Sequence, residues 1–317
     1  MNPDDPDDPD EIDGLRARVR TVMNAHWRSE GYTAPNPATY PFQWLWDSCF
    51  HAIIWAHLGE GERAAAELAH VFRTQDDDGF VPHIDYGAGP AVHAGFWGRA
   101  GSSSLTQPPM YGVAVSTLVA QGVAVPDGVV EAAASGLRFL LRRRRRHPSG
   151  LVPLCHPWEA GCDDSPRWDH WFVPADGPAV RYRVKGELLA GIVRSESGGP
   201  IANPAFDCAP AGFNALIALH QRRLAAATGE GGDDADELVE ALAPRWDVER
   251  RTWIDAGDGE SSTGAVRTLD ALLAVLVTGL APAAEAVHRD LVDPAAYGGR
   301  FGPAGVHRAE PSFEPGV

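Results

Sequence analysis

The chain has 317 residues, of which 44% are hydrophobic, and its 43 acidic side chains outnumber 27 basic ones to give a formal net charge of −16. This composition supplies a sizeable core and excludes a nucleic-acid partner, which would require a basic face to neutralise phosphates. No stretch approaches the ~20 consecutive apolar residues of a membrane span, and the acidic start is unlike a secretory signal peptide. We therefore expect a soluble, cytoplasmic protein without a membrane or nucleic-acid partner.

Residues 1–10 form a tract of Asp and Pro without large apolar side chains beyond Met1, which predicts a disordered acidic tail ahead of one domain spanning residues 11–317. From Glu11 onward, apolar residues recur at three- and four-residue spacing, which predicts helices. Besides the first, which extends to about residue 30, the predicted helices cover residues 45–59, 61–74, 105–121, 127–146, 205–228, 234–244, 267–280 and 283–291. Short β-like runs at residues 80–84 and 253–255 interrupt them.

The connections between the predicted helices are unequal. Some are tight, such as residues 59–61, whereas residues 75–104 and 147–178 form long stretches rich in Gly, Pro, His and Trp. Paired helices with short turns at one end and long loops at the other predict an all-α barrel or toroid whose loop-rich mouth carries the function. The basic run Arg142–Arg146 is interpreted as a solvated helix C-terminus, where cations complement the helix dipole. A docking patch is its alternative.

The four cysteines, Cys49, Cys155, Cys162 and Cys208, show no CxxC or Cys/His zinc spacing. Reduced thiols and the absence of a metal site are the simplest interpretation, and a disulfide between Cys155 and Cys162 is an alternative. The sequence also has no glycine-rich phosphate fingerprint and no P-loop, so no cofactor is expected.

Two motifs combine flat aromatic faces or amides with hydrogen-bonding groups. The segment 40–51 places Tyr40, Trp44 and Trp46 beside Asp47, a combination suited to a sugar, whose C–H faces stack on rings while its hydroxyls need polar partners. A helix start with buried tryptophans explains that segment equally well. The segment 101–111 fits a helix entry with Ser or Thr caps and prolines in the first turn, but this interpretation leaves the Gln107 amide free to hold a ligand hydroxyl.

The segment 156–169, HPWEAGCDDSPRWD, gathers four carboxylates and two tryptophans in a loop bent by Gly and Pro. Glycoside hydrolysis needs a carboxylic acid that stays protonated until it protonates the departing oxygen. Burial against aromatic rings and a neighbouring carboxylate both raise a carboxyl pKa, and this loop can supply both. A calcium loop is the alternative, although the EF-hand spacing with its closing Glu is absent.

Four segments in this order, QWLWDSCFHAI, GFVPHI, SSLTQPP and HPWEAGCDDSPRWD, resemble glycoside hydrolase family 63, closest to its bacterial mannosylglycerate and glucosylglycerate hydrolases. The resemblance covers about residues 12–317. It implies an (α/α)6 barrel and an inverting glycosidase for a small α-glucoside or α-mannoside, with Asp163 as the general acid. It further implies a sugar subsite, for which the candidate residues are Tyr40, Trp46, Asp47, Gln107, Trp158, Glu159 and Asp164. Ala160 stands where the family has a serine.

The chain departs from the family pattern at its end. The family's general base is a Glu that follows an RGPVWP-like segment, and the sequence reaches Val317 without either. We therefore expect a barrel incomplete at the C-terminus, with about ten helices in place of twelve, that lacks the general base. Apolar faces of helices 11–30 and 267–280 should then be exposed, which favours oligomerisation or poor solubility.

Two further functions remain open from the sequence. The same fold could bind sugar without turnover, which the missing base favours. Another helical-toroid sugar enzyme, an epimerase or lyase, would use histidines as acid and base, for which His51, His83, His93 and His156 are the candidates.

Overall fold

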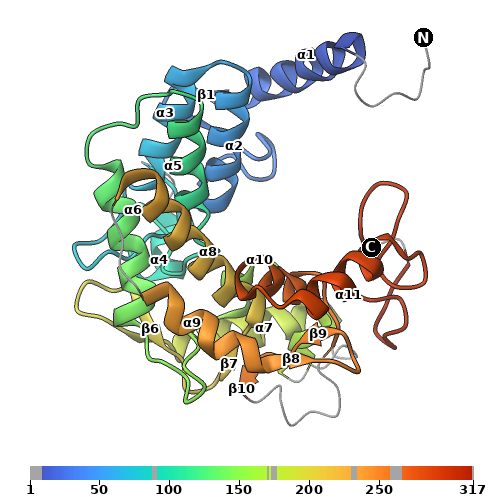
Figure 1. The fold of residues 1–317 in the computed structure, drawn as a ribbon. Helices are drawn as coiled ribbons and strands as arrows, with labels where there is room; N and C mark the ends of the chain where they lie inside the picture. The colour runs from blue at the N-terminus through green and yellow to red at the C-terminus, as the bar shows by residue number, and fades with distance from the viewer. Residues whose placement is uncertain are drawn as a thin grey trace.

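The computed structural model describes residues 9–87, 91–169, 171–172, 177–229, 234–257 and 266–315. Helices dominate this part of the chain (Figure 1). They are α1 (Pro9–His26), α2 (Leu45–His57), α3 (Gly61–Val71), α4 (Ala91–Trp97), α5 (Tyr111–Ala120), α6 (Val129–Arg138), α7 (Gly177–Ala190), α8 (Ala211–Thr228), α9 (Asp234–Leu242), α10 (Val275–Thr278) and α11 (Ala281–Val292). No helix of the described residues is long and apolar enough to cross a membrane.

The strands are two or three residues long and pair in antiparallel twos between the helices. The pairs are β1 (Trp27–Arg28) with β2 (Tyr32–Thr33), β3 (Gln43–Trp44) with β4 (Ile84–Asp85), β5 (Val193–Arg194) with β6 (Pro200–Ala202), β7 (Cys208–Ala209) with β10 (Ala256–Gly257), and β8 (Trp246–Asp247) with β9 (Thr252–Trp253). The pairing of β3 with β4 sets Trp44 opposite Ile84. It thereby joins two motifs that lie far apart in the sequence.

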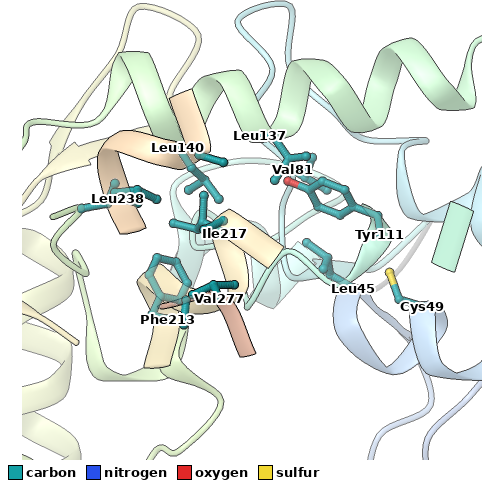
Figure 2. Packing of buried hydrophobic residues seen from close by; sticks show 14 of the residues in the cluster. Leu45, Cys49, Val81, Tyr111, Leu137, Leu140, Phe213, Ile217, Leu238 and Val277 are labelled. Atoms are coloured by element: carbon teal, nitrogen blue, oxygen red, sulfur yellow. The ribbon is translucent and has the colours of Figure 1, made fainter. Parts of the chain in front are cut away.

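Helix α8 lies at the centre of the core. It packs against α5, α6, α9 and the 3₁₀ turn Asp270–Ala274. Figure 2 shows Leu238 of α9 and Leu140, which follows α6 in the π-helical turn Phe139–Arg143, close to Ile217 of α8. The α5–α8 crossing is close because Gly112 has no side chain: a Cβ there would overlap the carbonyl oxygen of His220. The core is therefore built around one helix.

Helix α1 lies at the edge of this arrangement, and Figure 1 shows it leading away from the body. Its Leu15 and Val22 side chains are 52% and 55% exposed, and Leu276 of α10 is 55% exposed. Arg20 ties α1 to the end of α2 by donating a hydrogen bond to the Leu58 carbonyl oxygen at 2.7 Å. Apolar surface is thus exposed on both helical segments for which the sequence predicts it. Whether the chain associates through this surface stays a prediction.

The described helices follow the sequence prediction in most of the body and depart from it at several places. Residues 1–8 of the predicted tail lie outside the described residues, and α1 begins already at Pro9. Helix α8 begins only at Ala211, and the predicted helix 267–280 is the 3₁₀ turn Asp270–Ala274 followed by the short α10. Residues 105–110 are not helical; Pro108 and Pro109 lie there, and α5 begins only at Tyr111. The predicted helix 127–146 changes to a π-helical turn at Phe139–Arg143 and ends there. Helices α4 and α7 were not predicted, although α4 lies inside the long stretch 75–104. The four cysteines are all free thiols.

Candidate active site

A cavity of about 840 Å³ opens where five segments meet: residues 39–44, the β4–α4 region, Gln107, residues 158–164 and α7. Most of its wall is aromatic. The contributing rings are Tyr40, Phe42, Trp44, Tyr86, Phe96, Trp97, Trp158 and Tyr182. A concave, mostly apolar site with a few polar groups is the usual form of a small-molecule site.

The rings of this wall support one another through edge-to-face contacts. Trp44 meets Tyr40 with the ring centroids 5.4 Å apart, and Trp97 meets Trp158 at 6.1 Å. Trp97 also donates its Nε1 hydrogen to the Tyr86 hydroxyl at 2.9 Å. Edge-to-face pairs of this kind hold rings at fixed angles, so the wall presents flat apolar faces in a defined orientation.

The cavity is also lined by charged side chains, among them Asp163, Asp164 and Lys185. Burial raises the pKa of the Asp163 carboxyl to about 6; Lys185 opposes this shift, and the neighbouring Asp164 adds to it. A hydrogen bond from the Lys185 ammonium, with Nζ 2.7 Å from Oδ1, lowers the pKa of Asp164, whose side chain is 73% exposed. Lys185 also donates to the Asp163 carbonyl oxygen at 3.2 Å. The pKa values of these adjacent aspartates therefore shift in opposite directions: the protonated form of Asp163 and the anionic form of Asp164 are favoured.

Glu159 lies behind the cavity wall rather than in it. Its side chain is 0% exposed and forms a bidentate ion pair with Arg144, also 0% exposed. The same carboxylate accepts hydrogen bonds from the backbone N–H groups of Cys155, at 2.7 Å, and Thr106, at 3.4 Å. The structure thus corrects the sequence interpretation twice: Glu159 holds the loop instead of meeting a ligand, and Arg144 is buried instead of solvated.

Arg167 and Trp168 hold the far end of the same loop. Trp168 donates its Nε1 hydrogen to the Cys162 carbonyl oxygen at 2.7 Å. Arg167 bridges Asp255, at 3.0 Å, and Asp270, at 2.6 Å, and so fastens the loop to two later segments. Asp163 is therefore fixed from both sides, by Glu159 upstream and by this pair downstream.

The structure brings together five of the eight sequence-predicted site residues: Tyr40, Gln107, Trp158, Asp163 and Asp164 all line the cavity. Trp46 and Asp47 are not among its lining residues. The Trp46 ring lies against Gly161, whose positive φ of 71° and missing side chain make room for it. The backbone N–H of Trp46 donates a hydrogen bond to Gln107 Oε1 at 3.3 Å. Asp47 lies in the first turn of α2, and burial raises its pKa.

The cavity also contains residues that the sequence interpretation did not select. Arg181 and Lys185 come from α7, where their i, i+4 spacing places both on one helix face. Of the four candidate histidines, His83 and His93 line the cavity. His156 caps the turn Pro157–Ala160 instead, and burial lowers its pKa to about 3. Among the described residues, no group of three or more His, Cys, Asp or Glu is arranged to hold a metal ion.

An aromatic cavity with a carboxyl group of raised pKa fits an enzyme that acts on a carbohydrate, because glycoside hydrolysis uses such a carboxyl group as its acid. The family model of the mannosylglycerate hydrolase MGH1-like glycoside hydrolase domain matches residues 40–316. The chain belongs to this family.

Individual relatives agree with this assignment. A mannosylglycerate hydrolase of Rubrobacter radiotolerans is 31% identical over 217 residues, which cover 61% of this chain and 48% of the relative. A glucosylglycerate hydrolase of Mycolicibacterium hassiacum is 33% identical over 169 residues, covering 44% and 37%. The chain thus matches about half or less of the length of these relatives.

The fold is also similar to a solved structure. The family 63 mannosylglycerate hydrolase of Thermus thermophilus, in its complex with glucose, superposes with a TM-score of 0.76 at 26% identity. That superposition covers 95% of this chain and 82% of the other. The predicted helical family 63 fold is therefore confirmed.

Proposed function

We propose that the chain is the (α/α)6 glycosidase domain of an inverting enzyme that cleaves the α-glycosidic bond of a small glycerate glycoside. Asp163 is the general acid. The observation that carries this proposal is its carboxyl group, whose pKa burial raises to about 6 at the edge of an aromatic cavity. The relatives named as mannosylglycerate and glucosylglycerate hydrolases suggest the substrate class.

The cavity supports each part of the acid step. At pH 6 about half of the Asp163 carboxyl groups carry the proton that the leaving glycerate oxygen needs as the glycosidic bond breaks. Asp164 stays anionic because Lys185 holds it. Its charge helps to keep the proton on Asp163. An inverting mechanism also needs a second carboxylate, ~6.5–9.5 Å away across the sugar, to activate water, and the described residues that line the cavity offer none for this role besides Asp164.

A second candidate function is sugar binding without turnover. Of the described residues that line the cavity, Asp163 and Asp164 are the only carboxylates, and Asp164 is engaged by Lys185 at 2.7 Å and Arg181 at 3.4 Å. A carboxylate held in two ion pairs is a poor base because its pKa is depressed. The lack of a suitable base among these residues favours sugar binding without turnover.

The two candidates are separated by measuring binding and sugar release on the same protein. Glucosylglycerate and mannosylglycerate are titrated calorimetrically into the purified chain, and free sugar is quantified over time. The glycosidase proposal expects release that falls about 10²–10⁴-fold in Asp163→Asn, with binding retained. Asp236→Asn, an exposed carboxylate of α9 that pairs with Arg222, is the control that should change neither quantity.

The outcomes are distinct. Binding without release supports the second function, and failure of both glycosides to bind contradicts both. Where sugar is released, NMR of the first product tests the stereochemistry, because inversion of an α-glycoside yields the β-anomer first. An α-anomer would contradict the inverting mechanism.

A further inference from the structure

His83 occupies a position in the cavity wall that the proposed acid step does not use. His83 is only 3% exposed, and its ring lies between those of Trp44 and Trp97. The centroid distances are 5.5 Å to Trp44 and 5.3 Å to Trp97, both edge-to-face. The imidazole is therefore held rigidly while it still lines the cavity.

The inner hydrogen bonds of His83 determine which ring nitrogen carries the hydrogen. Nδ1 lies 3.1 Å from the Leu105 carbonyl oxygen and 2.6 Å from the Ser103 hydroxyl. A carbonyl oxygen can only accept, so the contact with Leu105 is a hydrogen bond when Nδ1 carries the hydrogen, and we assign this tautomer. The Ser103 hydroxyl accepts the Ile84 N–H at 3.1 Å, and in this tautomer its own hydrogen is free to go to the Leu105 carbonyl oxygen at 3.4 Å. Nothing in this group of atoms requires an unprotonated Nδ1.

The other nitrogen, Nε2, is consequently a bare lone pair. Burial lowers the pKa of His83 to about 4, so the ring is neutral at physiological pH. Neutral imidazole with a hydrogen on Nδ1 can only accept at Nε2. The described residues provide no hydrogen bond to this atom, whose ring lines the cavity. An acceptor in the wall of the cavity is available to a hydrogen-bond donor of a ligand that binds there.

We propose that His83 is a specificity-determining residue whose Nε2 accepts a hydrogen bond from one hydroxyl of the bound sugar. The assignment rests on the proposed function, because it places the sugar in this cavity. A lone pair set between two tryptophan rings favours a hydroxyl and rejects a carboxylate or an ether oxygen at the same position. His83 therefore selects the pyranose by one hydroxyl, while the rings bind its apolar face.

Two substitutions separate the cavity side of the ring from its inner side. In His83→Asn the amide nitrogen can replace Nδ1 as donor to Leu105, but no atom remains at the position of Nε2. In His83→Gln the amide oxygen can reach the position of Nε2, but the inner donor is lost. A role in packing alone would make the two variants similar, whereas hydroxyl recognition makes Asn the weaker binder.

The experiment is a binding series made in the Asp163→Asn background to prevent turnover. Glucosylglycerate and its 2-, 3-, 4- and 6-deoxy analogues are titrated into the parent, His83→Asn and His83→Gln. We expect His83→Asn to weaken glucosylglycerate at least ~10-fold, with no loss for the one analogue that lacks the recognised hydroxyl. His83→Gln should recover part of the affinity.

Equal binding of every analogue by parent and His83→Asn would overturn the role of His83 and leave the proposed function intact. Failure of the parent to bind either glucosylglycerate or mannosylglycerate would overturn both. Nitrogen-15 NMR of the unsubstituted ring provides a second measurement that does not depend on the variants folding. It should show hydrogen on Nδ1 and a shift of the Nε2 resonance when glucosylglycerate is added. Hydrogen on Nε2, or no shift on saturation with the glycoside, contradicts the proposal.

Discussion

The helical body and the loops around the cavity are held together by different forces. In the body, α5 and α8 meet through apolar side chains and approach closely at Gly112. Around the cavity, the loop that contains Asp163 depends on a buried ion pair between Arg144 and Glu159. Contact packing tolerates no added volume, while a buried ion pair tolerates no loss of a partner.

An ion pair also holds a second segment of the cavity, at β4 and the residues that follow it. Arg73 forms a bidentate ion pair with Asp85 of β4, with distances of 2.7 and 2.6 Å. Asp85 also accepts from the backbone N–H of Gly87 at 2.7 Å, so both flanks of the cavity residue Tyr86 are held. Charge thus positions the loops on two sides of the site. The comparison predicts that substitutions in the two regions fail for opposite reasons.

The largest effect should come from removing one partner of the buried pair. We expect Arg144→Met to lower the free energy of unfolding by about 3–5 kcal/mol, because the Glu159 carboxylate then stays buried without its cation. The neighbouring substitution Arg142→Met breaks only an exposed pair with Asp234 and should cost less than about 1 kcal/mol. Urea denaturation of both variants checks this. Equal losses of unfolding free energy in the two variants would contradict the importance of the buried pair between Arg144 and Glu159.

The body should instead be sensitive to added volume. Gly112→Leu forces α5 away from α8 and should lower the free energy of unfolding by about 3 kcal/mol. Gly186 of α7 is the matched control, because no atom lies within 4 Å of a Cβ built there. Gly186→Ala should stabilise the chain by up to about 1 kcal/mol through helix propensity. Thermal melts of both variants are the measurement, and an unchanged Gly112→Leu would contradict the close crossing.

Replacing Asp163 should have a smaller effect of opposite sign, an increase in the free energy of unfolding. Its folded pKa of about 6 lies above the ordinary 3.8, so the folded chain binds more protons than the unfolded chain between these two values. Stability therefore falls as the pH rises through this window, and the loss persists above pH 6. Asp163→Asn avoids this loss and should be more stable than the parent at pH 8 by about 1 kcal/mol, because the residue is exposed and solvent screens part of the effect. Equal stability at pH 8, measured by urea denaturation, would contradict the raised pKa of this carboxyl.

The sequence predicts the body better than the site because helical periodicity is local. Helix α8 lies within a predicted segment, but α7 does not, because Arg181, Arg183 and Lys185 alternate with less polar residues at a period of two. The residues that α7 adds to the cavity were missed for this reason. Arg144 was missed because its burial follows the π-helical turn Phe139–Arg143, which changes the direction in which subsequent side chains point.

Five site residues could nevertheless be predicted, because each belongs to a motif of unusual composition: Tyr40, Gln107, Trp158, Asp163 and Asp164. What the sequence could not reveal was the difference between Glu159 and Asp163, two carboxylates in one loop. Only the position of Arg144, 15 residues before Glu159, assigns one to the interior and leaves the other for the cavity.

The central claim, that burial prepares Asp163 as an acid, is tested most directly by a carbon-13 NMR titration of the aspartate carboxyl groups. Asp163→Asn and Asp164→Asn assign the two resonances. The account predicts that Asp163 titrates near pH 6 and that Asp164 titrates below its ordinary value because Lys185 holds its anion. An Asp163 carboxyl that titrates at or below its ordinary value of 3.8 would contradict the account and remove the general acid from this residue.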